Sequence, residues 1–117
     1  MEILEIASLA EFSPVKYVKT PLNNTKGLVR LLCFEPGQGV ALHKHPKADE
    51  IFYVLNGKAE LTVGEETAQI DAGRFVKAPA DTFHGWKNGP EKLILISVLM
   101  PVLSYAYAEE AARMEFM

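Results

Sequence analysis

Short apolar segments, separated by residues that favour turns, fill most of this chain. Leu28–Phe34 is almost wholly apolar apart from Arg30, whereas Lys58–Val63 alternates polar with apolar residues. Clusters of glycine, proline and asparagine follow such segments at short intervals. Segments of this length and spacing are typical of an all-β sandwich or barrel, and the pattern predicts roughly seven or eight strands.

The same pattern predicts strands at residues 50–55, 67–71, 75–78, 83–86 and 92–100. Asn56-Gly57 is a strong signal for a hairpin turn after the strand at 50–55. Leu93–Met100 is apolar on both faces apart from Ser97. Such a strand is expected to be covered on both sides, by the barrel core and by another sheet or a second subunit.

The two ends of the chain carry weaker patterns. Glu2–Phe12 fits either an early strand or a short amphipathic turn of helix, and Pro21 with Asn23 predicts a loop. Glu109–Met114 predicts a short C-terminal helix. Because no repeat, low-complexity tract or linker divides the sequence, one domain over residues 1–117 is expected.

Charge and cysteine content narrow the function classes. The 117 residues carry a formal net charge of −3, so nucleic acid is not an expected partner. No apolar run approaches the roughly 18 residues that a membrane span needs. The one cysteine, Cys33, excludes an intramolecular disulfide and fits a reducing compartment. Since the first residues are acidic where a secretion signal is basic, a cytoplasmic location is expected.

The three histidines and one glutamate form a candidate metal site. His43 and His45 are two residues apart, so in a strand both imidazoles point to one side. Glu50 opens the next strand after a short turn, and His84 lies in a strand about forty residues further on. Three neutral imidazoles and one carboxylate suit a first-row divalent metal.

The spacing of these residues resembles the cupin family. Its first motif is matched by Gly37, His43, His45, Glu50 and Gly57, all within residues 37–57.

The second motif lies within residues 73–88. It is matched by Gly73, Pro79, His84 and Asn88, with Asp81 where the family has a glycine. Because aspartate tolerates a left-handed backbone better than most residues, this departure does not change the expected fold.

The resemblance implies a double-stranded β-helix, the jelly-roll cupin barrel, here with a short C-terminal helix. It also implies that His43, His45, Glu50 and His84 bind one divalent metal ion, and that the protein is a homodimer. Manganese, iron(II), nickel and cobalt suit this donor set, and zinc or copper can also occupy it.

Three functions remain open for such a site. The first is a metalloenzyme acting on a small anionic or enolisable molecule, with oxygenase-like chemistry favoured over isomerase or lyase chemistry. The second is a non-catalytic module that binds or senses a small molecule. The third is a dimer in which the metal only stabilises the barrel. Fold alone does not choose among them.

Neighbouring positions supply candidates for a substrate pocket. Strand parity places Phe52 on the side of Glu50 and Trp86 on the side of His84. Core packing is the simpler interpretation for Phe52, whereas Trp86 is equally suited to stack on a substrate. Arg30 is a candidate anchor for an anionic substrate, and an exposed strand face or a salt bridge between subunits is the alternative. Cys33 has the opposite parity to Arg30 and is expected to be an inert buried thiol.

Overall fold

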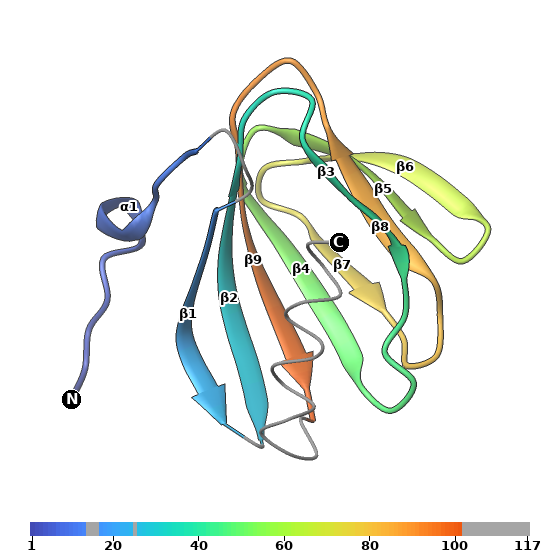
Figure 1. Ribbon diagram of the computed structural model, residues 1–117, viewed down its shortest axis with the longest axis horizontal. Coiled ribbons are helices and arrows are strands. Elements are labelled where there is room, and N and C mark those ends of the chain that lie inside the picture. The colour runs from blue at the N-terminus through green and yellow to red at the C-terminus, as the bar shows by residue number, and fades with distance from the viewer. Residues whose placement is uncertain (14–16, 25, 102–117) are drawn as a thin grey trace.

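The fold consists of two antiparallel β-sheets (Figure 1). The computed structural model describes residues 1–13, 17–24 and 26–101. The five-stranded sheet has the order β1 (Tyr17–Asn24), β2 (Gly27–Phe34), β9 (Leu93–Met100), β4 (Asp49–Asn56) and β7 (Phe75–Ala78). The four-stranded sheet has the order β3 (Gly39–His43), β8 (His84–Asn88), β5 (Lys58–Val63) and β6 (Glu66–Asp71). This arrangement confirms the all-β jelly-roll prediction.

The hydrophobic core lies between the sheets. Phe34, Phe52 and Leu95 of the five-stranded sheet pack in one cluster with Leu61 and Trp86 of the four-stranded sheet. Along β4 the inward residues are buried and alternate with half-buried ones, as strand parity predicts. The core shared by the two sheets fixes their position relative to each other. It therefore also positions the residues near the predicted metal site.

The loop predicted around Pro21 is wrong, because residues 17–24 form β1. Proline removes a ladder hydrogen bond, so a central strand would exclude it. β1 lies at the edge of its sheet, and its pairing with β2 shifts register between Lys19 and Leu22. An edge strand with an irregularity at that point accommodates the proline.

The hairpin predicted at Asn56-Gly57 is also wrong. The turn joins β4 to β5, but these strands belong to different sheets and do not pair. Gly57 has φ of 87°, and a Cβ there would lie 2.5 Å from the Lys92 carbonyl oxygen. The turn therefore needs glycine to carry the chain from one sheet to the other against the start of β9.

β9 is buried on one face and half-exposed on the other. Leu93, Leu95, Ser97 and Leu99 are fully buried, whereas residues 94, 96 and 98 are half-buried within the single chain. The prediction that β9 is covered on both faces therefore holds fully only for the face that points into the core.

The N-terminal segment contains one short helix, α1 (Ile6–Leu9), which has no buried residue and lies beside the five-stranded sheet (Figure 1). Of the two interpretations of Glu2–Phe12, the helical turn is the one observed. The predicted helix at Glu109–Met114 lies outside the described residues. No helix in the described ranges has the length and hydrophobicity that crossing a membrane requires.

Candidate metal centre

The four predicted metal-binding side chains come from three strands and one turn. His43 ends β3 and pairs with His84, which begins β8, so the four-stranded sheet holds these two side by side. Glu50 lies in β4 of the opposite sheet. His45 lies just beyond β3, in the turn rather than in the strand. The site is thus built from both sheets.

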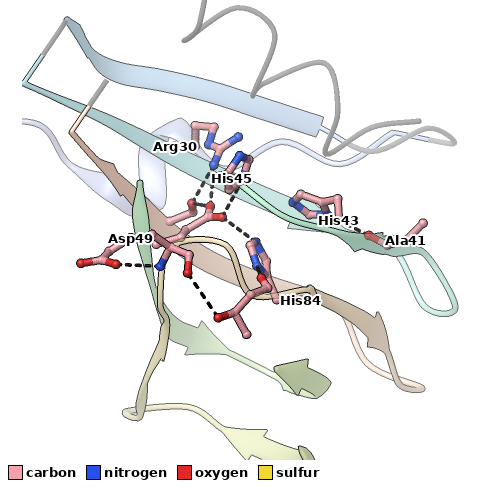
Figure 2. A network of polar contacts seen from close by, with 10 residues as sticks. Arg30, Ala41, His43, His45, Asp49 and His84 are labelled. Carbon is pink, nitrogen blue, oxygen red and sulfur yellow. Dashed lines mark hydrogen bonds and ion pairs between the residues drawn. The ribbon is translucent and has the colours of Figure 1, made fainter. Parts of the chain in front are cut away.

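The four side chains meet in the protein interior. Their candidate ligand atoms all lie within 4.8 Å of one another, and all four residues are buried. The ring centroids of His43 and His84 are 4.5 Å apart, and those of His43 and His45 are 5.1 Å apart. Figure 2 shows the imidazoles of His45 and His84 directed toward the same carboxylate. The structure therefore brings together all four residues that the motifs indicated.

Backbone carbonyls orient two of the imidazoles. Nδ1 of His43 lies 2.8 Å from the Ala41 carbonyl oxygen, and Nδ1 of His84 lies 3.0 Å from that of Thr82. A carbonyl oxygen only accepts, so each Nδ1 carries the proton in the neutral ring. Each Nε2 then presents a lone pair, which is the tautomer that binds a metal.

Glu50 lies at the centre of the cluster. Its Oε1 atom is 2.9 Å from Nε2 of His84 and 3.2 Å from Nε2 of His45. Its Oε2 atom faces the other way, where Nη2 of Arg30 donates to it at 2.5 Å and the Ser97 hydroxyl also donates. The two oxygens of one carboxylate therefore have separate partners.

These contacts place Arg30 in the barrel interior. Arg30 has no exposed surface, and its Nη2 atom also donates to Ser97 Oγ at 3.1 Å. The alternatives of an exposed strand face and of a salt bridge between subunits are therefore wrong. Burial of the charge is tolerated because Glu50 pairs with it and Ser97 joins the network.

The donor set fits a divalent cation. With its proton on Nδ1, a neutral His84 has no proton on Nε2 to donate to Glu50. The Nε2 lone pair therefore faces a carboxylate oxygen, and the two repel each other. A cation bound between them removes this repulsion. Bonds of about 2.1 Å at right angles separate neighbouring ligand atoms by about 3.0 Å. The distances of 2.9 and 3.2 Å from Glu50 Oε1 match that spacing. The buried group His43, His45, Glu50 and His84 is thus a candidate divalent-metal site.

The two aromatic pocket candidates both lie in the core. Phe52 is 1% exposed, and its ring centroid is 5.6 Å from that of His84. Trp86 is 4% exposed and packs against Phe52 and Phe34 at 4.9 and 5.8 Å. Phe52 therefore packs against His84, as the core interpretation predicts, and the indole lies one ring further from the site.

The turn before β8 is fixed by contacts that the sequence did not reveal. The Asp81 backbone N–H donates to the His45 carbonyl oxygen at 2.9 Å, and Asp49 accepts from the Ala80 N–H at 2.8 Å. Asp81 has φ of 60°, the left-handed conformation expected where the family has glycine. Two backbone-directed bonds thus tie the turn of the second motif to that of the first.

Asn88 anchors the other end of β8. Its Nδ2 atom contacts the carbonyl oxygens of Phe34, Glu35 and Glu91 at 3.3, 2.8 and 2.7 Å. The asparagine of the second motif is therefore a structural residue that joins two loops.

A cavity of about 340 Å³ opens between β6 and β7. Leu61, Val63 and Val76 contribute to its apolar lining, and Glu66 and Lys77 also border it. Val63 pairs with His84, and Val76 pairs with Phe52. The volume is in the range that holds a small organic molecule.

Comparison with known proteins identifies the family. Residues 30–99 match the sequence profile of the cupin domain. The crystal structure of a Thermus thermophilus protein superposes with a TM-score of 0.82 at 31% identity, covering 86% of this chain and 98% of that protein.

Two curated relatives are longer proteins. The polyketide synthase CurC of Streptomyces cyaneus is 30% identical over 79 residues, which cover 67% of this chain and 51% of CurC. The quercetin 2,3-dioxygenase of Bacillus subtilis is 28% identical over 82 residues, which cover 68% of this chain and 24% of the dioxygenase. The chain thus spans about half of CurC and a quarter of the dioxygenase. With the profile match and the two-sheet fold, the chain belongs to the cupin family.

Proposed function

We propose that this cupin is a metalloenzyme that acts on a small anionic or enolisable organic molecule. His43, His45, Glu50 and His84 are its metal ligands. The observation that carries the proposal is the meeting of three imidazoles and one carboxylate oxygen in the buried centre of the fold. The relationship to a quercetin 2,3-dioxygenase supports oxygenase-like chemistry, with isomerase- or lyase-like chemistry as the alternative.

The chain's own residues hold and orient this centre. The carbonyls of Ala41 and Thr82 fix the tautomers of two imidazoles. Phe52 packs against His84 and keeps water from that side. Bound there, a divalent ion would supply Lewis-acid polarisation of oxygen ligands. Manganese, iron, nickel or cobalt is favoured, with zinc or copper as further possibilities by affinity.

The test is the metal content of purified protein. We expect about one divalent ion per chain, and loss of most of it in His84→Ala, because one of four ligands is removed. Lys87→Ala is the matched control, since Lys87 lies on the same strand with an exposed side chain. Full retention of metal by His84→Ala would contradict the ligand assignment.

The alternatives to an enzyme are a non-catalytic module that binds a small molecule and a dimer in which the metal only stabilises the barrel. The low exposure of the four ligand residues, none of which exceeds 7%, favours the structural role. Proton relaxation of water in the manganese-loaded protein tests it. A closed ion supports the structural role, whereas rapid exchange of water at the ion supports a site open to a small molecule, in either the enzyme or the binding module.

We also propose that the protein is a homodimer. The outer face of the five-stranded sheet carries the half-buried Ile94, Ile96 and Val98 of β9 beside Ile51 and Tyr53 of β4. A second copy would cover this apolar face. Light scattering should give twice the mass of one chain, and Ile96→Lys should halve it. A monomeric wild-type protein at micromolar concentration would refute the proposal.

A reducing compartment such as the cytoplasm is the proposed location. Cys33 is fully buried, and the sequence holds no second cysteine to pair with it.

A further inference from the structure

We propose that the cavity between β6 and β7 is a binding site for a small neutral molecule that has two fused apolar rings and one hydroxyl group. The cavity has a volume of about 340 Å³, and β6 and β7 are edge strands of the two sheets. Because the site is formed without the candidate metal-binding side chains, the inference goes beyond the proposed function and does not depend on a metal.

Residues on the inner faces of both sheets line the cavity. Directly opposed residues of an antiparallel pair point to the same face. His84 is buried and pairs with Val63 of β5, which pairs in turn with Glu66 of β6. Phe52 is part of the core and pairs with Val76 of β7. The side chains of Val63, Glu66 and Val76 are therefore directed into the space between the sheets.

The apolar lining of the cavity is only partly covered by the described residues. Val63, Ile70 and Val76 pack against the core but are half-buried. Ala68 is exposed, although its pairing partner Leu61 is buried in the core. An apolar molecule in the cavity would remove this inner surface from water, which is favourable.

The volume of the cavity indicates the size of the molecule. An apolar cavity of about 150 Å³ holds one benzene ring. The volume observed here, about 340 Å³, is more than twice as large. The cavity therefore has room for two fused rings, and a third ring would extend into solvent.

Two charged residues at the cavity indicate the polarity of the molecule. Glu66 and Lys77 both border it and have opposite charges, so together they favour a neutral molecule. Lys77 pairs with Ile51, which alternates with the inward-facing Phe52, so Lys77 belongs to the outer face. Glu66 belongs to the inner face, and its carboxylate can accept a hydrogen bond from a hydroxyl group.

The test is equilibrium dialysis of the protein against phenol, β-naphthol and phenanthrol, which differ by one ring at each step. We expect one β-naphthol per chain, bound at least about fivefold more tightly than phenol, because the second ring also leaves water. Phenanthrol should bind no more tightly than β-naphthol, since its third ring stays in water. A rise in affinity with every added ring, or no saturable binding, would overturn the inference.

The same dialysis with protein as purified and with protein treated with EDTA separates this site from the metal centre. We expect equal affinity for β-naphthol in both samples. Binding that is lost with EDTA would mean that β-naphthol binds the metal, and it would overturn the inference while supporting the metal site.

A matched pair of variants locates the bound molecule. Ala68→Phe places a ring inside the cavity and should weaken β-naphthol binding by at least about tenfold, because one ring takes about half of the volume. Thr67→Phe places the same ring on the outer face of β6 and should change the affinity by less than about twofold. Equal effects of the two variants would overturn the assignment. If circular dichroism shows that Ala68→Phe is unfolded, Val76→Phe fills the cavity from β7 and should have the same effect.

The role of Glu66 is tested by the affinity ratio of β-naphthol to naphthalene, which lacks the hydroxyl group. Glu66→Leu removes the acceptor and should lower this ratio by at least about threefold. Glu66→Gln keeps an acceptor oxygen and should retain most of the ratio. An unchanged ratio in Glu66→Leu would overturn recognition of the hydroxyl group by Glu66.

Discussion

Replacing Arg30 by methionine in metal-free protein should lower the free energy of unfolding by about 3–5 kcal/mol. Methionine fills much of the volume of arginine but leaves the Glu50 carboxylate buried without its cationic partner. The pair has no exposure to water on either side chain and a contact of 2.5 Å. Screening by solvent therefore does not weaken it, in contrast to an exposed ion pair.

The magnitude can be separated into parts with two further variants. Ser97→Ala removes one donor to the same oxygen and should cost about 1 kcal/mol. The double variant Arg30→Met/Glu50→Gln removes both charges, so it should be more stable than the sum of the single changes predicts. A coupling free energy of about 2 kcal/mol or more is expected for neighbours in one buried network.

Urea unfolding followed by tryptophan fluorescence is a suitable assay. The chain has one tryptophan, Trp86, which lies buried in the core between the sheets. For a chain of this size, a loss of 3–5 kcal/mol corresponds to a fall in melting temperature of about 12–20 °C. Adding metal should reduce the loss, because a bound cation gives Glu50 another partner. A loss below about 1 kcal/mol with no coupling would refute the buried pair.

Three other predictions concern backbone and burial. Gly57→Ala should lower the free energy of unfolding, measured by thermal unfolding, by about 3 kcal/mol or more, because its Cβ would lie 2.5 Å from a carbonyl oxygen. Gly73→Ala, where φ is 90° but the Cβ would enter open space, should lower it by about 1 kcal/mol. Equal costs would show that the contact does not matter. Asp81→Gly should leave the melting temperature unchanged or slightly higher, since glycine takes φ of 60° without strain, and a large fall would show that the Asp81 side chain supports the turn. Burial raises the pKa of the Cys33 thiol above its ordinary value. The folded protein therefore holds this proton more tightly than the unfolded chain, so its contribution to stability is present below the unfolded pKa and is lost as pH rises through the folded pKa. Alkylation of native protein near pH 8 should be much slower than in guanidinium, and equal rates would contradict the buried thiol.

The sequence predicts the parts of the fold that depend on alternation and turn residues. Strands 58–63 and 75–78 were predicted with the observed bounds, because a polar–apolar period or a flanking turn defines each end. The residues that meet at the candidate metal site are also predicted from the sequence, since motif spacing carries that information.

Pairing between distant segments could not be predicted in the same way. The Asn56-Gly57 turn has the local chemistry of a hairpin, but the partner of each strand is decided by the core between the sheets. The role of Ser97 was missed for a related reason. Its one signal was a hydroxyl in an apolar strand, and its partners Arg30 and Glu50 lie 67 and 47 residues away.

The placement of three of the four candidate metal-binding residues on two different sheets has a mechanical consequence. His43 and His84 belong to the four-stranded sheet and Glu50 to the five-stranded sheet, so an ion bound by all of them is a cross-link between the two layers. Such a cross-link adds its binding free energy to the cohesion of the layers, in proportion to the logarithm of metal concentration above the dissociation constant. If the proposed ion binds there, the metal concentration sets how strongly the two sheets are held together. The rates of proteolysis or hydrogen exchange at the ends of β3 and β4 should therefore fall as the metal concentration rises.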